Sequence, residues 1–186
     1  MQIQKLVLDF FKVNFDRKGF DIKMKVLSID ASSKSTGVAI FEDEKLIGYK
    51  NIIAEGGDAY ARILHMTNVI AEIYDKFKPD KVVLEDVLPA DCGHSMQTFK
   101  VLHYLQANLV LMFYQKKQKV DLVVASSWRK ICGIHTGAGV KRDSLKMADV
   151  KFVKDNYNID VNDDIADAIC IGHAYISEQR YAARAF

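Results

Sequence analysis

Four acidic residues in this chain have the side chains and the spacing that can hold divalent metal ions. Asp30 and Glu85 each follow a short apolar run, and Asp164 and Asp167 lie three residues apart at the start of an apolar helical stretch. Ligands of open α/β sheets gather at the carboxyl ends of strands, and helical residues three apart share one face. We therefore expect the four carboxylates to meet at one edge of a sheet.

Carboxylates packed closely repel one another, and they cannot all stay ionised without a cation. A hard divalent ion with oxygen ligands resolves this conflict, and Mg²⁺ suits a few carboxylates together with the phosphate oxygens of a substrate. Four carboxylates can hold two ions, of which one activates a water molecule and the other stabilises the leaving oxygen. The expected chemistry is phosphodiester hydrolysis without a protein nucleophile.

Each acid also has a simpler interpretation. A single acid at a strand end is often only a polar residue where the strand leaves the core. Asp164 and Asp167 also fit a helix-capping arrangement. Capping accounts for one or two acids, but it does not explain why the small residues Ala166 and Ala168 flank Asp167.

The apolar pattern predicts the elements that would position these acids. Short apolar runs indicate five strands, and a turn is expected over Ser32, Ser33, Ser35 and Gly37. The expected strands cover residues 26–29, 38–41, 46–53, 82–84 and 122–124. Helices are expected at about 58–77, 95–117, 126–131, 141–157 and 164–181, with N-caps at Asp58, Ser95 and Ser126–Ser127. This order, βββαβαβ and then helices, predicts an α/β layer in which helices cover a central sheet.

The 186 residues fit one domain with a short appendage. We place that domain at residues 24–186 and treat 1–23 as an N-terminal extension of unknown role. No apolar run is long enough to span a membrane, and no signal peptide is evident. Three scattered cysteines favour reduced thiols in a cytoplasm, and Cys92 with His94 lacks the second ligand pair of a zinc site.

Positive charge is concentrated in one part of the chain. Residues 116–154 contain ten Lys and Arg against three Asp, a net charge of +7, which leaves −5 for the remainder of a chain at +2. Such asymmetry fits a basic surface that faces a polyanion, and it equally fits an ordinary solvated lysine face.

Four segments resemble, in order and at matching intervals, motifs of the RuvC-type Holliday junction resolvases within the ribonuclease H-like superfamily. Ile29–Ile40 resembles their first-strand motif, Val83–Val87 their fourth-strand glutamate motif, and Asp164–Ile169 their closing D-x-x-D-A helix. Gly133–Lys146, preceded by Trp128–Lys130, resembles their basic loop and helix. The resemblance covers about residues 25–177.

The resemblance implies a ribonuclease H-like fold, with a mixed five-stranded sheet and helices on both faces. It implies a homodimer that nicks two opposing strands of a four-way DNA junction with Mg²⁺ or Mn²⁺, with two ions in each subunit, in the cytoplasm of a bacterial or phage-infected cell. By position, the metal ligands would be Asp30, Glu85, Asp164 and Asp167. The catalytic basic residue at the scissile phosphate would be Lys141 or its neighbour Arg142, and Lys130, Arg129 and Lys146 are further candidates for DNA contact.

The sequence departs from the family pattern at two motif positions, and its N-terminal extension is also atypical. Ala31-Ser32 stands where Pro-Gly is usual, and Leu88 stands where an aromatic residue stacks on unpaired bases. These departures resemble a phage or divergent member with a broader range of branched substrates. The alternatives are a non-catalytic binder of branched DNA on the same fold, an RNA-processing nuclease of related fold, and an ATPase of the actin or sugar-kinase type. An ATPase of that type should carry a second glycine-rich phosphate hairpin, and this sequence shows none.

Overall fold

A mixed five-stranded sheet forms the centre of the computed structural model, which describes residues 24–89, 95–137 and 139–184. Its strand order is β3-β2-β1-β4-β5. The first three strands pair antiparallel, and β4 and β5 run parallel to β1. The predicted mixed sheet is therefore confirmed. The strands are β1 (Lys25–Asp30), β2 (Ser35–Glu42), β3 (Lys45–Ile53), β4 (Lys81–Glu85) and β5 (Val120–Val123).

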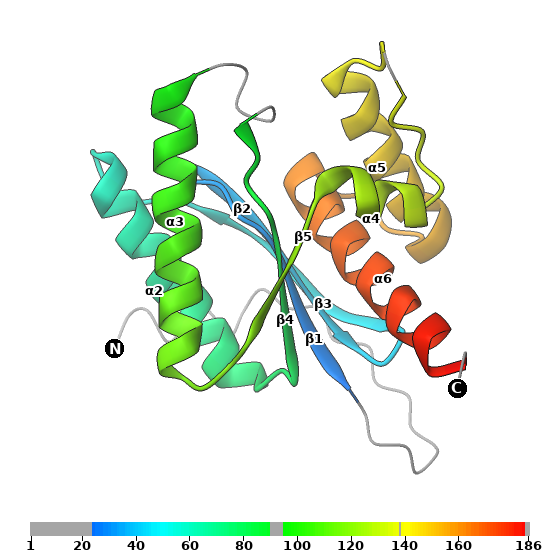
Figure 1. Ribbon diagram of the computed structural model, residues 1–186, viewed down its shortest axis with the longest axis horizontal. Coiled ribbons are helices and arrows are strands. Elements are labelled where there is room, and N and C mark those ends of the chain that lie inside the picture. The colour runs from blue at the N-terminus through cyan, green and yellow to red at the C-terminus, as the bar shows by residue number, and fades with distance from the viewer. Residues whose placement is uncertain (1–23, 90–94, 138, 185–186) are drawn as a thin grey trace.

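Helices cover both faces of this sheet, as predicted (Figure 1). They are α2 (Ala59–Phe77), α3 (Met96–Gln115), α4 (Ala125–Ile131), α5 (Arg142–Tyr157) and α6 (Asp163–Arg184). Alternate strand residues face opposite sides. Leu27 and Ile29 of β1 pack into the core beneath α2 and α3, whereas Val26 packs into the core beneath α4, α5 and α6. Ser28 also faces α6, because its hydroxyl donates to a carbonyl of that helix.

Of the three predicted helix caps, Asp58 and Ser95 are confirmed and Ser126–Ser127 is wrong. Asp58 accepts from the backbone of Ala61, and Ser95 accepts from that of Thr98. α4, however, begins at Ala125 with Val124 as its N-cap, so Ser126 and Ser127 lie exposed in its first turn. Asn162 caps α6 through its side-chain oxygen, because the helix begins one residue earlier than expected, at Asp163.

The predicted turn at Ser32–Gly37 is shorter than expected. Ser35 and Gly37 belong to β2, where Gly37 pairs with Asp30 on one side and with Asn51 on the other. Both residues are small because α6 packs closely against this part of the strand, as described below.

The remaining sequence expectations concern the termini, the cysteines and the membrane. The proposed extension at residues 1–23 and the disfavoured zinc pair Cys92 and His94 lie outside the described residues. Cys132 and Cys170 are free thiols. Among the helices of the described part of the chain, none has the length and apolar character needed to cross a membrane.

Candidate metal centre and nucleic-acid interface

Asp30 and Glu85 lie at the carboxyl ends of two neighbouring parallel strands. In the register of β1 and β4, Ile29 lies opposite Leu84, which brings the next residues of both strands to the same edge. Because side chains alternate, Asp30 lies on the face of Ser28 and Glu85 on the face of Val83. That face is covered by α6, the helix that carries Asp164 and Asp167.

Three contacts fix the start of α6, and two of them are made with the strands. Asn162 caps the helix, since its side-chain oxygen accepts from the backbone N–H of Ile165 at 3.0 Å. The hydroxyl of Ser28 donates to the carbonyl of Ala168 at 2.7 Å. Gly37 lies directly beneath the carbonyl of Asp164, where a side chain would have no room. These contacts bring the first turns of α6 to the strand ends that carry the other two acids.

The electrostatics of the acids show that they lie close together. Burial, and then the charges of Glu85 and Asp164, raise the pKa of Asp30 well above its usual range. Burial, and then the charges of Asp30 and Asp149, raise the pKa of Asp167 to about 9. Because Glu85 and Asp164 raise the pKa of Asp30, and Asp30 raises that of Asp167, the four predicted acids form one cluster that disfavours full ionisation without a cation.

Three of the four acids have protein partners. The indole N–H of Trp128 donates to Glu85 at 3.0 Å, and the Ser35 hydroxyl donates to Asp164. The guanidinium of Arg129 lies 3.7 Å from Oδ2 of Asp167. In this arrangement, no three acidic, His or Cys side chains among the described residues form a ready metal-binding group.

The cluster nevertheless fits a cation at one particular atom. Oδ1 of Asp167 is buried and has no hydrogen-bond partner, and it is the sole buried side-chain nitrogen or oxygen in the described ranges with that property. A buried carboxylate oxygen without a partner carries a large desolvation cost. An oxygen-seeking divalent ion would offset that cost, and all four predicted acids supply oxygen ligands of the kind it requires.

The basic segment divides into paired and unpaired residues. Six of its ten cations form ion pairs with acids: Lys116, Lys119, Arg129, Lys146, Lys151 and Lys154. Within the ranges that the structure describes, the four without an acidic partner are Lys117, Lys130, Lys141 and Arg142, and all four are exposed. Lys117 follows α3 at the opposite end of the sheet. The other three unpaired cations of this segment are Lys130, on α4, and Lys141 and Arg142, at the start of α5.

Arg129 and Lys146, which the sequence also predicts as DNA contacts, are paired with acids. Arg129 binds the buried Asp149 with two nitrogens, and its side chain is only 12% exposed. Lys146 pairs with Asp163, beside Asp164, which places the first turns of α5 against the start of α6. Both residues belong to the edge of the acidic cluster, whereas Lys141 and Arg142 begin α5 one turn earlier and reach solvent.

Sequence reasoning missed three residues of the site, namely Ser35, Trp128 and Asp149. The sequence places Ser35 in a turn, and it marks Trp128 only as part of a basic region. Asp149 was counted as a charge, although its place four residues before Val153, on the buried side of α5, signals a buried ion pair. An acid on the apolar side of a predicted helix requires a cationic partner.

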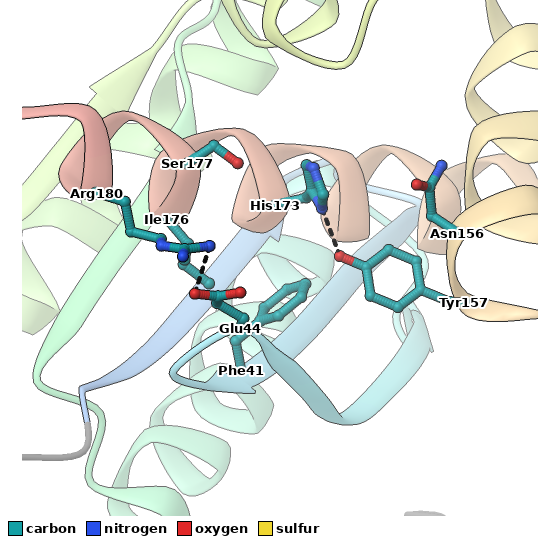
Figure 2. Close-up of a pocket in the computed structure, with 8 residues that line it drawn as sticks. All are labelled: Phe41, Glu44, Asn156, Tyr157, His173, Ile176, Ser177 and Arg180. Atoms are coloured by element: carbon teal, nitrogen blue, oxygen red, sulfur yellow. Dashed lines mark hydrogen bonds and ion pairs between the residues drawn. The ribbon is translucent and has the colours of Figure 1, made fainter. Parts of the chain in front are cut away.

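His173 of α6 lies away from the acids. Figure 2 shows its ring pointing at Tyr157, and the two are joined by a hydrogen bond of 2.7 Å. His173 and Tyr157 line a pocket with a volume of about 210 Å³, which is also lined by Glu44 and Arg180. Glu44 follows the end of β2, at the opposite end of the sheet from Asp30.

This sheet order, with its last helix lying across β1 and β2, defines an α/β protein of the ribonuclease H-like class. A family model described as crossover junction endodeoxyribonuclease RuvC matches residues 26–173, so the chain belongs to the RuvC family. It is therefore a junction-resolving endodeoxyribonuclease, as the sequence motifs predicted.

Solved structures share this fold at low sequence identity. Thermus thermophilus RuvC in complex with a Holliday junction substrate is 13% identical, with a TM-score of 0.68, over 85% of this chain and 96% of that one. The yeast mitochondrial Holliday junction resolvase Ydc2 is also 13% identical, with a TM-score of 0.60, over 87% of this chain and 82% of that one. No curated protein matches this chain.

Proposed function

We propose that this nuclease resolves four-way DNA junctions by paired, symmetric nicks, using divalent ions held by Asp30, Glu85, Asp164 and Asp167. The observation that carries the proposal is the meeting of acids from β1, β4 and α6, in which Asp167 keeps a buried oxygen without a protein partner. The choice of DNA is supported by Thermus thermophilus RuvC, whose structure holds a Holliday junction substrate.

The ions, most simply two Mg²⁺ with Mn²⁺ as a substitute, would activate water and stabilise the leaving oxygen of the phosphodiester. The chain's own part is to hold the ligands and orient the DNA. Ser35 donates to Asp164 and so fixes one carboxylate, while β1 and β4 hold those of Asp30 and Glu85 at the strand ends. Preorganised ligands avoid the cost of rearrangement during the reaction.

Lys141 or Arg142 would contact the scissile phosphate. Both are exposed at the start of the 16-residue helix α5, where the helix dipole adds positive potential. Lys130, exposed in α4, would contact the flanking backbone. Such contacts position the DNA and carry no sequence information themselves.

Paired nicks require two sites related by symmetry, so the proposed active form is a homodimer. A supercoiled plasmid that extrudes a cruciform tests this directly. Paired nicks within one binding event yield linear plasmid, whereas independent nicks yield open circles first. Linear product formed without an open-circle stage is expected with Mg²⁺ at all protein concentrations that form dimer. Accumulation of open circles alone would refute the paired mechanism.

A further inference from the structure

The short helix α4 contributes to the acidic cluster a side chain that is not acidic. Trp128 is 1% exposed, and its indole Nε1 donates to Oε2 of Glu85 at 3.0 Å. An indole has one N–H donor and no acceptor, so it can only donate, and it carries no charge. It can fix the direction of a carboxylate without neutralising the charge that a cation needs.

The indole itself is held in place by a second layer. The guanidinium carbon of Arg129 lies 4.2 Å from the centre of the Trp128 ring, within the range of a cation–π contact. Arg129 is in turn fixed by Asp149, which accepts at 3.0 Å from Nε and at 2.8 Å from Nη2. Asp149 is fully buried, so it requires this partner.

We infer that Trp128 is a positioning residue for Glu85, held in its own position by the Arg129–Asp149 pair. Glu85 ends β4 and is only partly buried, and the bond from Trp128 restricts the rotamers that its side chain can adopt. A donor that fixes one carboxylate oxygen limits that freedom, and such partners typically change metal affinity or activity by about 10–100-fold. The inference rests on the proposed function of Glu85 as a metal ligand.

The purely structural alternative is that Trp128 only fills the core between α4 and α6. The two interpretations differ in what Trp128→Phe does. Phenylalanine keeps an aromatic ring in the core but loses the N–H, so a structural role lowers stability and leaves metal affinity unchanged. A positioning role lowers metal affinity as well.

The test is Mn²⁺ binding to the full chain, measured by calorimetry without DNA, for wild type and two variants. We expect Trp128→Phe to bind Mn²⁺ about 10–100-fold more weakly. It should also lower kcat on junctions while leaving junction affinity in EDTA unchanged. Phe113→Leu is the matched control, because Phe113 is fully buried on the opposite face of the sheet and contacts no site acid. It should lower stability and keep wild-type Mn²⁺ affinity.

The single tryptophan of the chain offers a second measurement that needs no core substitution. Mn²⁺ should change the emission of Trp128 saturably in the wild type, and Glu85→Gln should weaken that response. Equal Mn²⁺ affinity for wild type and Trp128→Phe would overturn the positioning role. A Trp128 emission that stays unchanged when Mn²⁺ binds to the wild type would overturn it as well. A wild type that binds no Mn²⁺ would instead overturn the proposed metal-dependent function.

Discussion

A Cβ atom at Gly37 would lie 1.8 Å from the carbonyl oxygen of Asp164, so β2 and α6 approach each other as closely as their backbones allow. The neighbouring Ser35 hydroxyl, two residues away on the same face of β2, donates to the side chain of that aspartate. The strand therefore fixes both the backbone and the carboxylate of Asp164. The position of this acid depends on two small residues of β2, 127 or more positions earlier in the chain.

Gly37→Ala should therefore destabilise the protein and displace α6. Overpacking of this kind costs about 1–3 kcal/mol. The clash is with a backbone atom, which cannot move aside as easily as a flexible side chain. Urea denaturation measures the loss, and Mn²⁺ affinity should fall with it. Gly57→Ala is the control, because nothing lies within 4 Å of its added Cβ. Wild-type stability and Mn²⁺ affinity in Gly37→Ala would contradict the close contact.

The free energy of unfolding of the metal-free protein should fall as pH rises. The pKa of Asp167 is raised to about 9 in the folded chain, against about 3.9 when unfolded. Between these values the folded chain holds a proton that the unfolded chain has lost, so increasing pH favours unfolding. Asp30 acts in the same direction. The melting temperature in EDTA should drop from pH 5 to pH 9.

Asp167→Asn should reduce the slope of that pH dependence, since it removes the titrating group. Mg²⁺ should raise the melting temperature most at the high end of the range, where the ion no longer competes with the proton. Identical slopes for wild type and Asp167→Asn in EDTA would show that Asp167 ionises normally.

Neutral replacements of the acids should separate binding from cleavage. Asp30→Asn or Glu85→Gln should lower cleavage of four-way junctions by several orders of magnitude, because a ligand for the ions is lost. Junction affinity should stay the same or improve, since acid–phosphate repulsion is removed. Gel-shift binding in EDTA and single-turnover cleavage with Mg²⁺ measure the two effects. Full activity of Glu85→Gln would exclude the proposed site.

Junction affinity should fall steeply with salt, because lysine and arginine contacts release counterions from DNA. Each lost phosphate contact should reduce the slope of log affinity against log salt by about 0.9, so Lys141→Ala with Arg142→Ala should reduce it by about 1.8. Lys117→Ala is the control at the opposite end of the sheet, and it should leave the slope unchanged. Fluorescence anisotropy at several salt concentrations measures both, and equal slopes would place DNA elsewhere.

The sequence predicted the sheet, the helices and the four acids, because these follow from local patterns. Strand-length apolar runs ending in Asp30 and Glu85 need no knowledge of distant contacts. The missed features depend on tertiary packing. The sequence places Gly37 in a turn. The reason for a glycine there appears only in the folded chain, where α6 lies over β2 and leaves no room for a side chain.

The partners of the acids could not be predicted from local patterns either, because they are distant in the sequence. The hydrogen bond from Trp128 to Glu85 joins residues 43 positions apart, and the pair of Arg129 with Asp149 joins residues 20 apart. A basic segment in sequence is not a basic surface, since six of its ten cations are paired with acids in the structure.

The most direct measurement uses an end-labelled four-way junction and a linear duplex of the same sequence, with Mg²⁺, Mn²⁺ or EDTA. The products of wild type and Glu85→Gln are resolved on a denaturing gel. We expect paired nicks near the crossover with wild type and either metal, and none with EDTA, on the duplex or with Glu85→Gln. Tight junction binding by wild type without any nick in either metal would contradict a metal-dependent resolvase.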